Sequence, residues 1–307
     1  MTTTPRTRLD SLAADTAMGP VTLLVGDLDL QTRYYHQVLG LDVVEHPDER
    51  IEGVGRPDVV VLGRGTRPVI VLRHTPDLPP TSRHQAGLFH TAILFDTRAA
   101  LAATLTSVAA RAPQTFVGSA DHLVSEAFYL TDPEGNGVEL YWDRSRDSWT
   151  YDADGHVQMD TLQLDPNGFI REHATEDDLA AVAGAAGSVG RPLVGHVHLQ
   201  VGDVPSGRAF YVDALGFDVT AQWHGALFVS AGGYHHHIAM NTWNSAGAGP
   251  RASALGLGEV VVVVPRNDDV GALRDRLAHH RVPVNDDGGT ITFEDPWRNT
   301  VRVRTAV

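Results

Sequence analysis

The 307-residue chain contains no cysteine, and this absence removes several kinds of chemistry at once. Disulfide bonds, thiolate nucleophiles, Cys-ligated zinc and iron–sulfur clusters are all excluded. A metal bound by this protein would therefore have to use histidine, aspartate or glutamate as ligands. The sixteen histidines of the chain make such a site easy to assemble.

Basic residues are scarce, since 24 Lys and Arg stand against 38 Asp and Glu, for a net charge of −14. Phosphate backbones are bound by clusters of basic side chains, and because we find no such cluster we expect no nucleic-acid partner. No apolar run approaches the roughly 18 residues of a membrane span, so we expect no membrane partner. Residues 1–18 are polar and Thr-rich and do not resemble a secretory signal, which predicts a poorly ordered tail and a cytoplasmic protein.

An internal repeat organises the rest of the chain. Residues 21–27 (VTLLVGD) match residues 197–203 (VHLQVGD), and the match continues without a gap at a constant offset of 176 residues (197 − 21). A second match joins residues 132–139 (DPEGNGVE) to residues 295–302 (DPWRNTVR). Each half of the chain therefore contains two similar units.

Each unit begins with an apolar strand, continues with a helix and ends with shorter strands. This predicts an α+β protein with the order βαβββ four times, over residues 19–76, 87–144, 194–243 and 254–305. We divide the chain into a tail (1–18), an N-terminal region with modules one and two (19–144), a linker (145–193) and a C-terminal region with modules three and four (194–307). The linker is predicted to contain one short helix near Glu176 to Ala183.

Several motifs in these modules resemble the vicinal oxygen chelate superfamily, above all the hairpin at 132–139 and the Gly-Asp pair after the first strand of modules one and three. Further segments narrow the resemblance to two-domain catechol 2,3-dioxygenases of the extradiol type: 119–126 (SADHLVSE), 195–199 (GHVHL), 232–237 (GGYHHH) and 241–243 (NTW). The resemblance covers nearly all of residues 19–305. It implies that the four modules form two cup-shaped half-barrels and that two His and one Glu bind Fe(II).

In this superfamily the ligands come from the first and last strands of the modules. The matching positions are occupied, in first strands, by Pro20, His90, His196 and Glu259, and in last strands by Glu139 and Arg302. Proline offers no ligand atom and arginine keeps its proton, so modules one and four have lost their ligands. The resemblance thus points to His90, His196 and Glu139, a set typical of non-haem Fe(II) oxygenases, with Mn(II) as the alternative metal.

The three residues can share one site only if module two pairs with module three, or if a dimer exchanges modules. We predict the intrachain pairing, which the long linker permits, and leave homo-oligomerisation open. A single strand histidine is more often a surface or core residue than a ligand. His198 lies two residues from His196 on the same strand face, so it could be a pocket neighbour or itself the ligand.

The resemblance also assigns roles beside the metal. His236 corresponds to the catalytic acid–base histidine, although the run from His235 to His237 could instead be a structural cluster beside the metal, and His237 could contact metal or substrate. We place this run on a strand, where alternation would put His236 on the face opposite its two neighbours. His122 and Tyr129 are implied to donate hydrogen bonds to substrate oxygens, although His122 could equally lie in an exposed loop.

Together these features predict an extradiol (meta) ring-cleaving dioxygenase that acts on catechol or a substituted catechol, with a small aromatic diol and O2 as its partners. A glyoxalase-like isomerase would need a second glutamate, and the last strand of module three contains no carboxylate. A metal-dependent thiol transferase of this fold normally has only two modules. A non-catalytic ligand-binding protein of bleomycin-resistance type would lack the metal trio.

Overall fold

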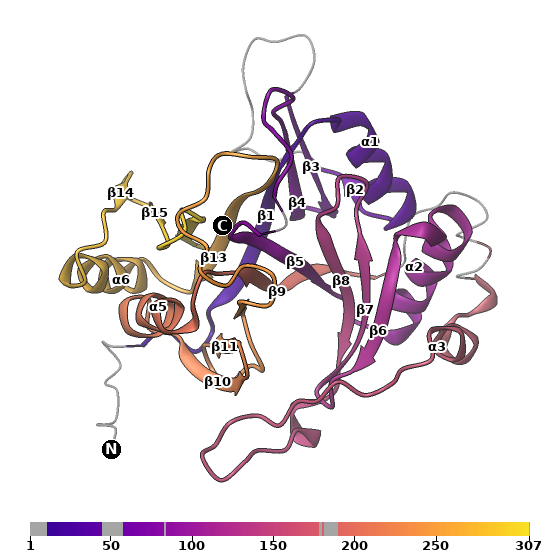
Figure 1. Ribbon diagram of the computed structural model, residues 1–307. Helices are drawn as coiled ribbons and strands as arrows, with labels where there is room; N and C mark the ends of the chain where they lie inside the picture. The colour runs from indigo at the N-terminus through magenta and orange to yellow at the C-terminus, as the bar shows by residue number, and fades with distance from the viewer. Residues whose placement is uncertain (1–10, 45–57, 83, 178–179, 181–189, 307) are drawn as a thin grey trace.

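A computed structural model describes residues 11–44, 58–82, 84–177, 180 and 190–306 (Figure 1). Within these ranges the order βαβββ occurs four times, as the sequence predicts. The elements of module one are β1 (Ala17–Val25), α1 (Leu28–Arg33), a π-helical turn (Tyr34–Val38), β2 (Asp42–Val43), β3 (Val59–Arg64) and β4 (Arg67–His74). Those of module two are β5 (Gly87–Leu94), α2 (Arg98–Arg111), a 3-10 turn (Pro113–Thr115), β6 (Phe116–Asp121), β7 (Ser125–Thr131) and β8 (Gly137–Asp143).

The C-terminal half repeats this plan. Module three consists of β9 (Leu193–Gln200), α5 (Val204–Arg208), a π-helical turn (Ala209–Ala214), β10 (Asp218–Trp223), β11 (Ala226–Ser230) and β12 (Ile238–Asn241). Module four consists of β13 (Gly256–Val264), α6 (Asn267–His279), β14 (Asn285–Asp286), β15 (Thr290–Glu294) and β16 (Thr300–Thr305). None of the helices in the described ranges is long and apolar enough to cross a membrane.

The four modules form two curled eight-stranded sheets, and the pairing is the one that the metal trio requires. One sheet joins modules one and four in the order β14-β15-β16-β13-β1-β4-β3-β2. The other joins modules three and two in the order β10-β11-β12-β9-β5-β8-β7-β6. We call these the outer-module and inner-module half-barrels. The prediction that module two pairs with module three within one chain is confirmed.

The repeated Gly-Asp pair has a local structural reason. Asp27 and Asp203 are the N-cap residues of α1 and α5, where their carboxylates accept hydrogen bonds from the backbone N–H of Leu30 (2.9 Å) and Ser206 (2.7 Å). The first strand of each odd-numbered module therefore passes directly into a helix. This turn sends the helix across the outside of its sheet and leaves the inside of the cup open.

The repeated Asp-Pro hairpin is also built alike in both halves. Asp132 accepts hydrogen bonds from two backbone N–H groups of its own turn, from the Asn136 amide and from the Tyr35 hydroxyl (3.2 Å). Asp295 does the same in its own turn and accepts from the Tyr211 hydroxyl at 2.9 Å. Each tyrosine belongs to the preceding module, so this bond ties module one to two and module three to four.

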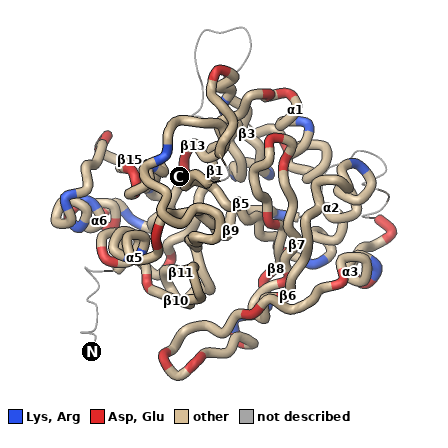
Figure 2. The backbone as a smooth tube through the Cα atoms, in the orientation of Figure 1, with Lys and Arg blue, Asp and Glu red and all other residues tan. Residues whose placement is uncertain are grey.

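The core is a contiguous apolar cluster that extends through both half-barrels, with Leu23 of β1, Leu140 of β8 and Val197 of β9 among its fully buried members. The central strands β5 and β9 carry no charged residue and are drawn tan in Figure 2. Charged residues lie mainly on the peripheral helices and loops (Figure 2). The polar side chains of these two strands are therefore uncharged: histidine, glutamine and one threonine.

The linker differs from the sequence prediction. The structure shows a helix that we had not predicted, α3 (Pro166–His173), which is capped by Asp165, contacts α2 and packs Phe169 against Phe128 of β7. The short helix that we expected near Glu176 to Ala183 lies largely outside the described residues. One buried aromatic residue is enough to dock so short a helix. The sequence of the linker therefore shows no long periodic pattern from which the helix could have been predicted.

Candidate active site

Strand register brings the predicted metal trio together. Ala92, in the middle of β5, pairs with Glu139 of β8 on one side and with His196 of β9 on the other. Residues that pair directly across neighbouring strands point to the same face of a sheet, and His90, two residues before Ala92, shares that face. The three side chains therefore meet above Ala92, whose methyl group leaves room beneath them.

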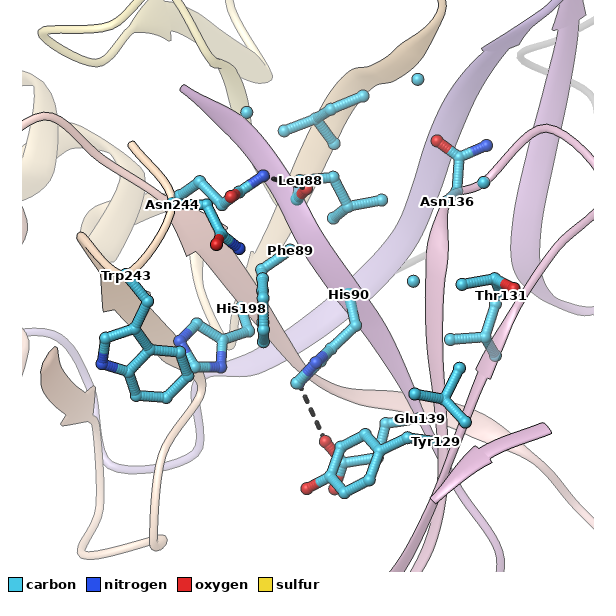
Figure 3. Close-up of a pocket in the computed structure, with 18 of the residues that line it drawn as sticks. Leu88, Phe89, His90, Tyr129, Thr131, Asn136, Glu139, His198, Trp243 and Asn244 are labelled. Atoms are coloured by element: carbon cyan, nitrogen blue, oxygen red, sulfur yellow. Dashed lines mark hydrogen bonds and ion pairs between the residues drawn. The ribbon is translucent and has the colours of Figure 1, made fainter. Parts of the chain in front are cut away.

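The distances within the trio show convergence on a single atom. Oε2 of Glu139 lies 2.9 Å from Nε2 of His90 and 3.2 Å from Nε2 of His196. Only the second contact has the geometry of a hydrogen bond, so the buried Nε2 of His90 is left without a hydrogen-bond partner. Figure 3 shows the His90 ring directed at Glu139. Two imidazoles and a carboxylate around one point are the arrangement of a metal-ligand set.

The electrostatics of the trio fit a cation. Burial lowers the pKa of His196 to about 4, although the Glu139 carboxylate opposes this effect. Burial alone would raise the pKa of Glu139, but His196 and His90 beside it hold that pKa well below its usual range. At neutral pH we therefore expect neutral His196 and ionised Glu139, which are the forms that coordinate metals.

A second group that could hold a metal shares one member with the trio. His196, His235 and His236 also place a nitrogen atom each within 4.8 Å of one another. Two of its histidines are already engaged with each other, because Nδ1 of His235 and Nδ1 of His236 form a hydrogen bond of 2.7 Å. The all-histidine group also lacks a carboxylate, which iron(II) and manganese(II) prefer. We therefore favour His90, Glu139 and His196.

The three consecutive histidines do not lie on a strand, which corrects the sequence prediction. Gly232 and Gly233 adopt positive φ angles of 62° and 68°, and the turn they form delays the start of β12 to Ile238. As a result His235 and His236 face each other, with ring centroids 4.5 Å apart, instead of pointing to opposite faces. Only His237 turns away, toward Ser230.

His236 is the member of this run that lines the cavity, and its ring lies against His196 with centroids 4.0 Å apart. Behind it stands a chain of hydrogen bonds. Nε2 of His235 lies 3.0 Å from Oδ1 of Asp143, and Oδ2 of the same carboxylate accepts a hydrogen bond from the Tyr234 hydroxyl at 2.8 Å. Because an ionised carboxylate only accepts, Nε2 of His235 carries the proton. In neutral His235 Nδ1 must then accept from Nδ1–H of His236, which leaves Nε2 of His236 without a proton.

His122 and Tyr129 are paired, and both line the cavity. Nδ1 of His122 lies 2.6 Å from the carbonyl oxygen of Asp160, so this nitrogen donates. Nε2 of a neutral His122 then accepts from the Tyr129 hydroxyl, also at 2.6 Å. Burial, and secondly the Glu139 carboxylate, raise the pKa of Tyr129 well above its usual value, so Tyr129 stays a phenol. Tyr129 pairs with Glu139 across β7 and β8, which places it next to the trio.

His198 lies in the same cavity, but no group of three ligand-type residues in the described ranges includes it. The side-chain oxygen of Asn241 accepts from the backbone N–H of Trp243 at 3.1 Å, so its amide nitrogen faces His198. That nitrogen lies 2.9 Å from Nε2 of His198, which therefore accepts and leaves the proton on Nδ1. His198 is thus a fixed neutral neighbour of the cavity.

The cavity above the trio has a volume of about 1460 Å³ and is lined by residues of both half-barrels. In Figure 3 His90, Glu139 and Tyr129 lie at one end, and Leu88, Asn136 and Asn244 lie toward the other. Trp243 is half exposed and lines the cavity. Asp143 and Gln200 also emerge only from the structure, although Gln200 continues the alternation of His196 and His198.

Comparison with known proteins agrees with this geometry. Residues 17–140 and 193–303 match the model of the Glyoxalase/Bleomycin resistance protein/Dioxygenase superfamily, and the chain belongs to this superfamily. A Bacillus subtilis protein named catechol-2,3-dioxygenase is 33% identical over 294 residues, which cover 94% of this chain and 96% of the relative.

Solved structures that share the fold are more distant in sequence. Glyoxalase I from Zea mays superposes with a TM-score of 0.54 at 15% identity, over 95% of this chain and 92% of that one. The cppA protein of Streptococcus pneumoniae superposes with a TM-score of 0.56 at 11% identity, over 96% of this chain and all of that one. At such low identity these neighbours support the fold alone.

Proposed function

We propose that the protein is an extradiol dioxygenase that opens the ring of a catechol next to its two hydroxyl-bearing carbons, with Fe(II) held by His90, His196 and Glu139. The observation that supports this most is the convergence of two imidazole nitrogens on one oxygen of Glu139 in the wall of a large cavity. The relative named catechol-2,3-dioxygenase, which aligns over almost its full length, supports the same reaction class.

The fit of the residues to iron rests on their chemistry. Three protein ligands on one side of a metal leave coordination positions open for a diol and for O2. Fe(II), when bound, would supply a template that chelates both diol oxygens and a path for electrons to O2. Mn(II) has similar ligand preferences and is the alternative metal.

The residues of the chain would handle protons and orientation. Nε2 of His236, left unprotonated by the hydrogen bond to His235, is placed to accept a proton from a catechol hydroxyl and to return it to the product. The Tyr129 hydroxyl donates to His122, so its oxygen can accept a hydrogen bond from the substrate, in contrast to the donor role that the resemblance implies. The buried side chains around the trio restrict access of water.

Other activities of the superfamily find less support here. A glyoxalase-type ligand set needs a second carboxylate, and the other glutamate that lines the cavity, Glu134, already accepts hydrogen bonds from the backbone of Gly26 and Asp27 at 2.7–3.1 Å. In the described residues neither metal-binding group near β9 contains a carboxylate other than Glu139. A pure ligand-binding role would not require His236 to be held in a single tautomer.

The decisive experiment loads the protein with Fe(II) under anaerobic conditions and then adds catechol and air. We expect a yellow ring-opened semialdehyde, identified by mass spectrometry, and no product in protein treated with a chelator. Loading with Mn(II) in parallel compares the two metals. If iron binds stoichiometrically but neither catechol nor any substituted catechol is consumed, the proposed reaction is wrong.

A further inference from the structure

The cavity is much larger than the proposed reaction requires. Its volume of about 1460 Å³ exceeds the roughly 300–1,000 Å³ of pockets that enclose a drug-sized ligand. An unsubstituted catechol consists of a single six-membered ring with two hydroxyl groups. Such a substrate would therefore leave most of the cavity empty. The empty part extends along one strand.

The part of the cavity beyond the trio extends along strand β9. His196, His198 and Gln200 are alternate residues of this strand, so they share the face that lines the cavity. At roughly 3.3 Å per residue, Gln200 lies about 13 Å along the strand from His196. On the neighbouring strand Gly87 pairs with Gln200, and Leu88 with Leu199. Gln200 therefore lies beyond the metal trio, two residues past His198, which is the strand partner of His90.

Gln200 has an unsatisfied hydrogen-bond acceptor. Its side chain is about nine-tenths buried, with 9% of the residue exposed. Nε2 donates to the carbonyl oxygen of Leu88 at 3.3 Å, and this bond fixes which end of the amide is the nitrogen. Oε1 is buried and has no hydrogen-bond partner among the described residues. A buried acceptor without a donor is unfavourable, so a donor from a bound molecule would stabilise it.

The surroundings of Gln200 define the rest of the ligand. Leu88 and Leu257, the latter from the outer-module half-barrel, give this end of the cavity apolar walls. Arg251 is the basic group nearby, but it already donates to the carbonyl oxygens of Leu257 (2.6 Å) and Arg298 (3.3 Å). Asn136 is likewise committed to its hairpin, through Asp132. Among the polar groups at this end in the described residues, Oε1 of Gln200 is the buried atom that lacks a hydrogen-bond partner.

We propose that Gln200 is a specificity-determining residue, and that the substrate is a catechol with an apolar substituent that ends in a hydrogen-bond donor such as a hydroxyl or amide N–H group. This inference rests on the proposed function, because it places the diol at the metal trio. The substituent lies along His198 and Leu88. Oε1 of Gln200 is covered in the structure, so the amide turns into the cavity to meet the donor.

The test compares catechols that carry the same alkyl chain ended by a hydroxyl, a methyl or a carboxylate group, over a series of chain lengths. Two quantities are measured: kcat/KM in the iron-loaded enzyme and Kd by calorimetry with the metal-free protein. In the natural protein we expect a preference of about tenfold for the hydroxyl end over the methyl end at one chain length, as for a single neutral hydrogen bond.

The variant Gln200→Met keeps the size of the side chain but removes the acceptor. We expect it to lose the preference for the hydroxyl end. The matched control is Gln222→Met, at an exposed position of β10, which should leave the preference unchanged. A preference that survives in Gln200→Met, or a natural preference for the carboxylate end, would overturn the proposal.

The two readouts separate this inference from the proposed function. If the hydroxyl-ended compound binds tighter in a Gln200-dependent way but no catechol is cleaved, the subsite is supported and the reaction is wrong. If catechols are cleaved but the end group has no effect on kcat/KM or Kd, the reaction stands and the subsite is wrong.

Discussion

The two half-barrels share one plan but differ at the place where the inner-module half-barrel holds its trio. His90 and Glu139 correspond in the repeat to Glu259 and Arg302 of the outer-module half-barrel. There the Arg302 guanidinium makes contacts of 2.9 and 3.0 Å with one oxygen of Glu259. In the outer-module half-barrel the carboxylate of Glu259 is thus already paired with a cationic side chain of the protein, Arg302.

The position beneath the trio differs as well. Ala92 of β5 corresponds to Val261 of β13, which pairs with Arg302 just as Ala92 pairs with Glu139. Val261 is almost fully buried, and its side chain fills space that the methyl group of Ala92 leaves open. The comparison teaches that two halves with the same strand order can differ at this one place, with a small residue beneath an unpaired carboxylate in one half and a valine beneath an internal ion pair in the other.

The largest difference is expected between Glu139→Ala and Arg302→Ala. Without Glu139 two neutral imidazoles remain, and they should hold Fe(II) poorly, so bound iron and catechol turnover should both be lost. Without Arg302 the loss should be limited to a partly exposed ion pair, worth about 1 kcal/mol of unfolding free energy. Iron per chain, turnover and a melting curve are measured for both variants. Iron lost from Arg302→Ala but kept by Glu139→Ala would contradict both the site and the comparison.

The second-largest effect is expected for His236. Among the described residues of module one, the matching position carries no side chain that could bind a metal. His236→Ala should keep iron and lower kcat by about 10²–10⁴-fold, the usual worth of a positioned acid–base group. Iron content and kcat are measured on the same preparation. Parallel loss of iron and activity would instead make His236 a ligand, as in the group with His196 and His235.

A smaller effect is expected for Asp143, whose counterpart in module four, at the same offset of 163 residues (302 − 139), is Ala306. In Asp143→Asn the new amide can donate as well as accept a hydrogen bond, so it no longer holds His235 in one tautomer. As a result, Nε2 of His236 is without a proton only part of the time. We expect a fall in kcat of about tenfold, with KM and iron content unchanged.

The exposed Asp147 provides the control for this prediction, because Asp147→Asn changes the same net charge nearby without touching the histidines. A pH profile of kcat distinguishes tautomer control from a structural role, since only the former should shift the profile of Asp143→Asn relative to the natural protein. An unchanged profile and an unchanged kcat would show that Asp143 does not act through His235.

The smallest effect is expected for Tyr35 and Tyr211, whose hydroxyl groups bond to the two repeated aspartates. Tyr35→Phe and Tyr211→Phe each remove one hydrogen bond to a buried aspartate, so each should lower the free energy of unfolding by about 0.5–1.5 kcal/mol. Only Tyr35 supports the hairpin that leads into β8 and Glu139, so only Tyr35→Phe should also weaken iron binding. Equal effects of the two variants on iron affinity would mean that the hairpin does not orient Glu139.

Much of this architecture could be predicted from the sequence because the repeat is well preserved. The offset of Pro20 and His196 and the match of Glu139 with Arg302 predict the four modules. The pairing of module two with three and the proximity of the trio follow only when the ligand positions implied by the family resemblance are added to the repeat.

Other features depend on contacts between distant strands. The central place of Ala92 follows from its register with both β8 and β9, which no local pattern encodes. The prediction that the run from His235 to His237 alternates failed because the glycine turn before it overrides strand periodicity. Asp143 lies 92 residues from His235, so the bond between them becomes visible only in the folded chain.

The interleaved order of the modules also has a consequence for the synthesis of the protein. β1 and β5 are central strands, yet one neighbour of each, β13 and β9, is translated only after the linker. A nascent chain that ends near residue 144 therefore presents two open strand edges with apolar residues, which favour pairing with other chains. Neither cup can close until the ribosome has passed most of the message, so expression at a reduced rate or temperature should raise the yield of monomeric protein.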